Sequence, residues 1–372
     1  MKYILTSSKR YTRIAIIFTI IAAVISCSIV LKAEGIIAEF TLRDEIQNVL
    51  EGYFKERCNA LISGDVAVIK NQFQLSSRYG QWSYEHEAKR IKFATDWNIA
   101  RKVIFKQCES KLKIFSVRGG ESAVRVYLND RTKMSYIYAD QKDGPLNEFC
   151  FATYHTMNLI KRDDKWYVTV DWYSDPLEDT IPDERMPQAD TPQEETVSGG
   201  SWFKYDRAKA IEYADKYCGA NYIIEDGYKY NKKYRSYADM GGDCANFVSQ
   251  VLSDKSAGGI RTSGGWQYSK GKGSASWVNA GKFTYNLLYS GRGKLVSKGK
   301  YEKVVNYIGK VSPGDIIAYQ KKGDIVHVSI ITAVDSMGVP LVDSHTNDRY
   351  HVPWDLGWNS SGVTFWLIKI NG

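Results

Sequence analysis

The chain has 372 residues, which is enough for two domains of ordinary size. Hydrophobic residues make up 44% and charged residues 25% of it, a globular composition that excludes a wholly disordered or fibrous protein. The formal net charge of +8 is moderate and is not gathered into a long Lys/Arg run, so no nucleic-acid partner is expected.

The N-terminal segment predicts export. Basic residues precede a nearly uninterrupted apolar run over residues 14–31, which is about long enough to span a bilayer. The basic flank is expected to stay inside and the rest of the chain to face outward. We therefore expect an uncleaved signal-anchor over residues 1–34, which tethers the protein to the cell membrane. A cleaved signal peptide that releases a secreted protein, or a lipid anchor at Cys27, are the alternatives.

Residues 36–175 are predicted to be an α+β domain with an antiparallel sheet. Apolar residues recur at helical spacing over residues 42–61, and an aromatic-rich helical region covers residues 84–97. The period then changes to two, and strands are predicted at 103–115, 122–128, 134–138, 150–159 and 165–172, with a hairpin turn at 162–164.

Helices followed by such a sheet, which ends in a long strand, a charged turn and a Lys-Trp-Tyr-Val strand, resemble the cone-shaped nuclear-transport-factor-2-like domains. Cones of this kind can hold a catalytic Asp/His pair. His155 lies in an alternating strand, but the sequence matches no acid to it, so a structural or surface role is expected. The domain is interpreted as a spacer or a binding module.

A linker is predicted over residues 176–200. Four of the eight prolines fall in or beside it among acidic residues, and it ends in a Ser/Gly cluster. Such sequence cannot bury a core, so it marks the boundary before a second domain, residues 201–372.

The cysteine count leaves two interpretations open. The six cysteines have spacings that match no zinc site, and no metal or cofactor is expected. Apart from Cys27 and Cys244, they either form disulfides in an oxidising exterior or are small buried apolar residues.

The most informative stretch is Gly241-Gly242-Asp243-Cys244-Ala245-Asn246-Phe247-Val248-Ser249-Gln250. A glycine pair ends a loop, Asp243 is expected to cap a short amphipathic helix, and Cys244 lies in the first turn of that helix. The positive end of the helix dipole is expected to lower the pKa of the thiol and so favour a nucleophilic thiolate.

This run resembles the signature of the bacterial putative amidase domain, which is similar to the papain-like CHAP and NlpC-type cell-wall hydrolases. The resemblance covers residues 205–372 and includes Ser276-Trp277, the Pro313-Gly314-Asp315 turn and the strand of His327. It implies a papain-like α+β fold in which the nucleophile stands at a helix N-terminus on an antiparallel sheet.

The histidines after Cys244 supply the rest of the predicted site. His327 lies in the middle of an apolar strand, where a polar ring must be paired or functional, and it is predicted to be the general base. In the NlpC-like arrangement the third member comes from the next strand, and His345 best matches that place by resemblance. Asp343 and Asn347 are rivals for it.

The backbone N–H of Cys244 is expected to stabilise the oxyanion, with Tyr234 or Tyr237 as a further donor. Trp266, in a glycine-rich loop over residues 258–273, is predicted to face the substrate.

The sequence therefore predicts an exported, membrane-tethered cysteine amidase or peptidase. Its predicted partners are a cell-envelope peptide or peptidoglycan substrate and the membrane, contacted through residues 14–31. The alternative is a non-catalytic envelope-binding module that keeps the fold.

Overall fold

The computed structural model describes residues 42–177, 204–358 and 362–372. We call residues 42–177 the first unit and residues 204–372 the second unit. In the first unit, the segments in which apolar and polar residues alternate form long strands. These are β1 (Val103–Gly120), β2 (Ala123–Tyr138), β3 (Asn147–Arg162) and β4 (Lys165–Trp172). Two predicted strands within residues 122–138 are one strand, because β2 pairs along its whole length with both β1 and β3. The predicted hairpin turn is present, with Asp163 and Asp164 at φ 48° and 56°.

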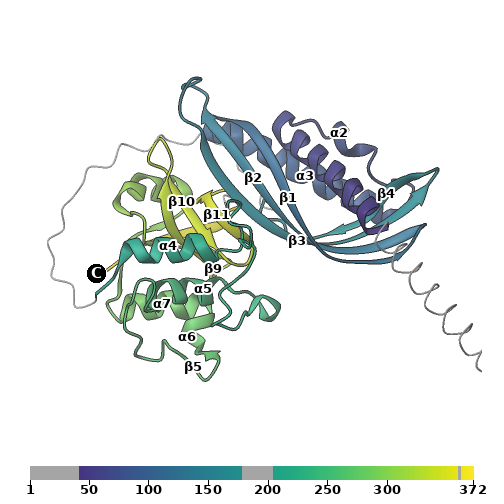
Figure 1. Cartoon of the computed structure of the whole chain (residues 1–372). Coiled ribbons are helices and arrows are strands. Elements are labelled where there is room, and N and C mark those ends of the chain that lie inside the picture. Colours follow the sequence, from purple (N-terminus) through teal and green to yellow (C-terminus); the bar gives the residue numbers. More distant parts are fainter. Residues whose placement is uncertain (1–41, 178–203, 359–361) are drawn as a thin grey trace, which may run out of the picture.

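Helices cover one face of these strands (Figure 1). They are a helix over residues 42–63, the short α2 (Ala67–Lys70) and the long α3 (Arg78–Arg101). The Ser77 side chain caps the start of α3 by accepting from the backbone N–H of Gly80. The helix ends at Lys102, which adopts the left-handed conformation.

The second unit places helices around a sheet of short strands. Its helices are α4 (Arg207–Tyr217), α5 (Cys244–Ser253), α6 (Ala275–Val278), α7 (Ala280–Tyr289) and α8 (Tyr301–Val304), with the 3₁₀ segments η1 (Ala238–Met240) and η2 (Val305–Lys310). Its strands are the small pair β5 (Tyr268–Ser269) and β6 (Lys272–Gly273), then β7 (Gly293–Gly299), β8 (Ile316–Lys321), β9 (Asp324–Val334), β10 (Pro340–Ser344), β11 (Asp348–Pro353) and β12 (Val363–Ile370). The sequence predicts one helix over residues 277–289, whereas extended backbone at Asn279 divides α6 from α7.

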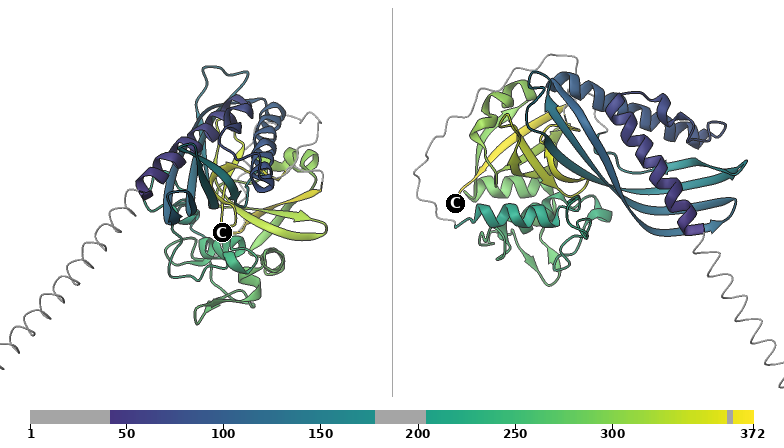
Figure 2. Two further views of the ribbon diagram at one scale, coloured as in Figure 1. Left: turned by 90° about the vertical axis from the view of Figure 1, so that its right-hand side faces the viewer. Right: turned by 45° about the horizontal axis from the view of Figure 1, so that its top comes forward.

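One sheet runs through both units. Among the described residues it has ten strands in the order β1-β2-β3-β11-β10-β9-β8-β12-β7, with β4 beside β3, and each of its strand pairs is antiparallel. The join is the pairing of β11 with β3, in which Arg349 lies opposite Phe151. The strands of the two units accordingly lie side by side in every view (Figures 1 and 2). The predicted α+β class with an antiparallel sheet is confirmed.

Buried polar contacts reinforce the join. Arg131 on β2 donates from Nη1 to the carbonyl oxygens of Asn221 and Ile224, at 2.7 and 2.8 Å. Its Nη2 donates to the carbonyl oxygen of Glu225 at 3.1 Å. Arg101 pairs with Asp355 from the opposite unit. The two units are therefore held together by much more than the predicted linker.

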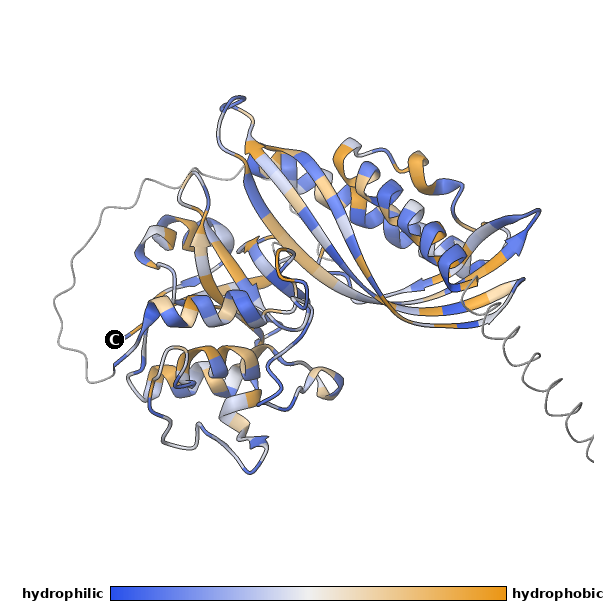
Figure 3. Cartoon of the chain, in the orientation of Figure 1, coloured by the Kyte–Doolittle hydropathy of each residue, from blue (hydrophilic) through white to orange (hydrophobic). Residues whose placement is uncertain are grey.

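Three apolar clusters fill the interior, and Figure 3 shows hydrophilic and hydrophobic segments alternating along the helices. The first lies between the helices and strands of the first unit. In the second unit, one cluster packs α4, α5 and α7 on one face of the sheet, and it includes Val328 and Ile330 of β9. The other fills the opposite face and includes Ile331 of β9 with Trp354 and Trp358.

Two expectations concern the membrane and the cysteines. No helix within the described ranges is long and apolar enough to cross a membrane. The predicted span over residues 14–31, Cys27 and nearly all of the predicted linker lie outside the described residues. Five cysteines are described, and all of them are free thiols: Cys58, Cys108, Cys150, Cys218 and Cys244.

Candidate active site

Cys244 is the first residue of α5, as the sequence predicts. The loop before it turns through Gly241 and Gly242 at φ 99° and 123°, where a side chain would be strained. The helix packs on β9, and the thiol is only 6% exposed. Burial raises the pKa of Cys244 to about 11, although hydrogen bonds from the backbone of Val328 and Ala245 act to lower it. The predicted lowering of this pKa is thus not found, because desolvation outweighs the helix start.

Asp243 does not cap α5 with its side chain, contrary to the expectation from its position. Its Oδ1 instead accepts from the backbone N–H of Tyr237 at 2.6 Å and from Asn246 Nδ2 at 2.9 Å. Its Oδ2 lies 2.6 Å from Nδ1 of His345. The carboxylate therefore joins the loop before Cys244, the helix α5 and the end of β10.

His345 follows β10 and faces α5. Its ring stacks between Tyr230 and Phe247, with centroids 3.6 and 4.1 Å away. Its Nε2 lies 2.7 Å from the carbonyl oxygen of Tyr217, while Nδ1 meets Asp243. Both partners are acceptors, so both bonds are made when both ring nitrogens carry hydrogen. The imidazole is 1% exposed and is fixed in place from all sides.

His327 lies in the middle of β9, but its ring is on the face of the sheet away from α5. It stacks on Trp358 at 5.0 Å and lies 5.5 Å from Tyr319, both members of the opposite cluster. The next residue, Val328, faces α5 and Cys244, as strand alternation requires. Burial lowers the pKa of His327 to about 3, assisted by Arg349. Its Nε2 is buried and has no hydrogen-bond partner among the described residues.

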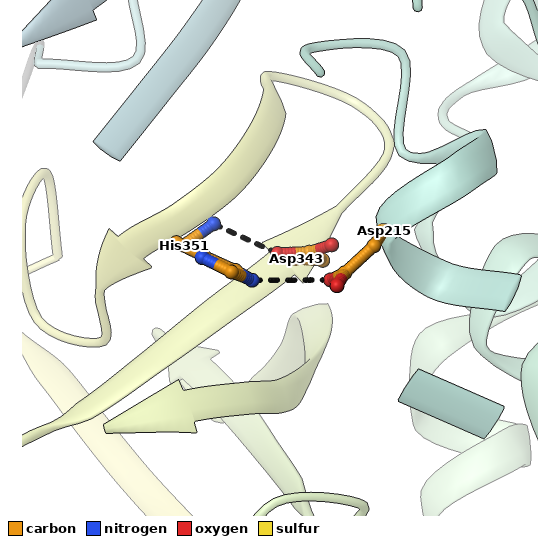
Figure 4. A group of neighbouring side chains, drawn as sticks. All are labelled: Asp215, Asp343 and His351. Atoms are coloured by element: carbon orange, nitrogen blue, oxygen red, sulfur yellow. Dashed lines mark hydrogen bonds and ion pairs between the residues drawn. The ribbon is translucent and has the colours of Figure 1, made fainter. Parts of the chain in front are cut away.

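The rivals for the third position are placed apart from His327. Asp343 faces the side of α4, and its Oδ1 accepts from Thr332 Oγ1 at 2.9 Å. It forms a group with Asp215 and His351 whose possible ligand atoms all lie within 4.8 Å of one another, so these residues could hold a metal ion (Figure 4). Asn347 lies in the tight turn between β10 and β11 at φ 68°, where its side chain accepts from Ser174.

The side chains predicted to stabilise the oxyanion or to face the substrate form hydrogen bonds within the fold. The Tyr234 hydroxyl donates to Asp254 at 2.6 Å, and the Tyr237 hydroxyl accepts from the backbone N–H of Gly273 at 2.8 Å. The sequence predicts a substrate-facing position for Trp266, whereas the structure buries it completely. Its Nε1 donates to Ser249 Oγ at 2.9 Å.

The polar residues within the motif were not assigned a role from the sequence, and they hold the surrounding loops. Asn246 accepts from Trp277 Nε1 at 2.8 Å and donates to the carbonyl oxygen of Arg235. Ser249 donates to the carbonyl oxygen of Trp277, and Gln250 accepts from a tyrosine of α4. The sequence feature that could have revealed them is their spacing of three and four residues, which places these polar side chains on one face of the buried helix.

The first unit has a groove of its own between α3 and β4. Three of its aromatic residues, Tyr79, Trp82 and Trp172, are 61%, 48% and 68% exposed, and His86 lies among them. Asp171 also lines this groove, and its Oδ1 lies 2.7 Å from Nδ1 of His155.

Thr153 meets the other ring nitrogen of His155 at 2.7 Å, so this buried ring is fully bonded. The sequence matched no acid to His155, whereas the structure pairs it with Asp171, and its complete burial excludes a surface role.

Comparison with known proteins supports the resemblance to the putative amidase domain that the Cys244 motif indicates. Residues 204–368 match the family model described as a putative amidase domain. Over 170 residues the chain is 30% identical to the uncharacterized protein YhbB of Bacillus subtilis (strain 168), a stretch that covers 44% of this chain and 48% of that protein. The chain thus spans about half the length of this curated relative. The match indicates amide hydrolysis as the general chemistry of the second unit.

Proposed function

Taking the match of residues 204–368 to the putative amidase domain as the premise, we propose that the second unit hydrolyses an amide bond with Cys244 as the nucleophile. The observation that carries the proposal is the position of Cys244. It is the first residue of α5, and its sulfur lies against the backbone of Val328 on β9. Backbone N–H groups at such a helix start are the donors that stabilise a developing oxyanion.

The raised pKa of Cys244 determines what the base must do. With a pKa of about 11, the thiolate fraction at pH 7 is on the order of 10⁻⁴. A base must therefore take the proton as sulfur attacks the carbonyl carbon, and must return it to the leaving amine. Water then releases the acid from the thioester.

We assign this base to His327, the residue next to Val328. Its Nε2 is an unpartnered buried acceptor, which is the kind of group that can receive a proton. In the structure the ring and Cys244 lie on opposite faces of β9, so proton transfer between them requires β9 to shift by one residue against its neighbours, since rotation of the side chain alone cannot cross the sheet. In its observed position burial lowers the pKa of His327 to about 3, so the ring is neutral and able to accept a proton.

His345 is assigned a positioning role beside the nucleophile. Its bond to Asp243 and its stacking on Phe247 fix the loop that leads into Cys244. This assignment differs from that of His327 in a measurable way, because a positioning residue affects stability as well as rate.

The test is hydrolysis of peptidoglycan fragments by the full-length protein, compared with His327→Ala, His345→Ala and the control His86→Ala. Loss of turnover in His327→Ala with unchanged thermal stability supports its role as base. Full activity in His327→Ala refutes it. His345→Ala should lose both stability and activity, whereas His86→Ala, which removes a partner of the buried Asp175, should lose some stability but no activity.

A second candidate function is envelope binding without catalysis. Two observations favour it: the buried, protonated thiol of Cys244, and the ring of His327 turned to the other face of the sheet. The groove of the first unit, with its exposed Trp82 and Trp172, suits binding of an envelope polymer. Retention of peptidoglycan by Cys244→Ala, with loss of retention in Trp82→Ala/Trp172→Ala and no hydrolysis by the parent protein, identifies this case.

Residues 14–31 complete the proposal as a membrane anchor that places both units outside the cell, next to envelope peptides.

A further inference from the structure

A group of three side chains lies where α4 meets the β10–β11 hairpin. Asp215 comes from α4, Asp343 from β10 and His351 from β11, and the three converge (Figure 4). His351 Nε2 lies 3.1 Å from Asp215 Oδ1. The side chains of Asp215 and His351 are 29% and 22% exposed, whereas Asp343 is completely buried.

Asp343 is the buried member of this group, and only one of its two carboxylate oxygens is paired. Its Oδ1 accepts from Thr332 Oγ1 and from the backbone N–H of His351, at 2.9 and 2.8 Å. Its Oδ2 is buried without a hydrogen-bond partner among the described residues. A carboxylate oxygen buried in this way is costly unless it is paired or binds a metal.

The second carboxylate makes this cost larger. The possible ligand atoms of Asp215 and Asp343 lie within 4.8 Å of each other, and two carboxylates so close repel when both are charged. A bound cation would neutralise the two carboxylates together.

The surrounding bonds fix the ligand atoms in direction. Thr332 and the His351 backbone hold one oxygen of Asp343, so the free oxygen remains directed toward the group. The ring of His351 is stacked on Tyr350 with centroids 4.0 Å apart. Orientation of metal ligands by such neighbours is usual in protein metal sites.

We propose that Asp215, Asp343 and His351 bind one divalent transition cation, with Zn²⁺ as the best fit. One imidazole and two carboxylates are a ligand set that Zn²⁺ accepts, with water in the fourth position of a tetrahedron. Ca²⁺ requires six to eight oxygen ligands and gains nothing from the imidazole. The spacing of these residues matches no metal motif, so the proposal departs from the sequence-based expectation of no metal.

The cation would tie α4 to the hairpin close to the candidate active site. Two residues beyond Asp215, the carbonyl oxygen of Tyr217 meets His345 Nε2 at 2.7 Å. A metal that fixes α4 therefore also fixes one partner of His345. This inference does not depend on which reaction Cys244 performs.

The test is metal binding to the full-length protein after treatment with a chelator, measured by calorimetry with Zn²⁺, Mn²⁺ and Ca²⁺ and by metal analysis after dialysis. One Zn²⁺ per chain is expected, bound at least tenfold more weakly by Asp343→Asn and by His351→Gln. The matched control His86→Gln should bind like the parent. Absence of stoichiometric Zn²⁺ binding, or equal binding by all variants, overturns the proposal, and so does binding of Ca²⁺ in preference to Zn²⁺.

Thermal unfolding separates loss of the site from loss of the fold. Without metal, Asp343→Asn should be at least as stable as the parent, because the amide removes a buried carboxylate. With Zn²⁺, the unfolding temperature of the parent should rise and that of Asp343→Asn should stay unchanged. Equal rises in both proteins would show adventitious binding elsewhere and refute the assignment.

Discussion

The carboxylate of Asp243 gives the sharpest prediction about stability. It is 1% exposed and accepts from the backbone of Tyr237, from Asn246 and from His345. Asp243→Ala leaves the Tyr237 N–H and Nδ1 of His345 without a partner, while Asn246 keeps only its bond to the carbonyl oxygen of Arg235. Each buried donor left unpaired costs about 1–3 kcal/mol, so we expect a loss of about 4 kcal/mol in the free energy of unfolding.

Asp243→Asn should behave differently. The amide oxygen still accepts from Tyr237 and Asn246, and the amide N–H can donate to Nδ1 of His345. The ring, carrying one hydrogen on Nε2, then keeps its bond to the carbonyl oxygen of Tyr217. The loss should be only about 1 kcal/mol, because each buried group keeps a partner.

Urea unfolding of the full-length protein at pH 7 measures both losses. Asp239→Ala is the matched control, since Asp239 is exposed in the same loop, and it should change stability by less than about 0.5 kcal/mol. Equal losses for Asp243→Ala and Asp243→Asn, or a loss below about 1 kcal/mol for the alanine variant, would refute the reasoning.

Three other predictions follow from buried or paired groups. Because burial raises the pKa of Cys244 to about 11, its alkylation rate should rise about tenfold per unit from pH 8 to pH 10, and a plateau below pH 8 would contradict this. Burial raises the pKa of Asp348 to about 7, so the folded chain holds a proton that the unfolded chain releases near pH 4. This carboxyl should therefore contribute a fall of about 3 kcal/mol in stability from pH 4 to pH 7, and Asp348→Asn should remove that contribution in urea titrations. Arg131→Met should cost about 3 kcal/mol in the same assay, since three carbonyl groups lose a charged donor, whereas Arg125→Met on the exposed side of β2 should cost almost nothing.

Much of the fold could be predicted from local patterns. The strands β1, β3 and β4, the helices α3, α4 and α5 and the place of Cys244 all follow from periodicity, which is set by neighbours along the chain. The pairing of β11 with β3 could not be predicted. The sequence around His351, rich in Tyr, Pro and Trp, is typical of a turn, and the strand found there is stabilised by a partner about 200 residues earlier in the chain.

The sequence named candidate residues for the site but could not predict how they are arranged. Alternation along β9 assigns His327 and Val328 to opposite faces, but the sequence does not say which face meets α5. Asp343 and His345 share a face, as alternation predicts, and still have different partners, because α4 brings Asp215 to one and the loop before α5 brings Asp243 to the other. The burial that raises the pKa of Cys244 is likewise a product of tertiary packing.

The central claim is that Cys244 attacks an amide carbonyl, and trapping of the acyl-enzyme tests it most directly. The full-length protein is mixed with peptidoglycan fragments, quenched in acid and mapped by peptide mass spectrometry, next to Cys244→Ala. A thioester is expected on the peptide that contains Cys244, formed before product appears, and no product is expected from the variant. Undiminished hydrolysis by Cys244→Ala would contradict it.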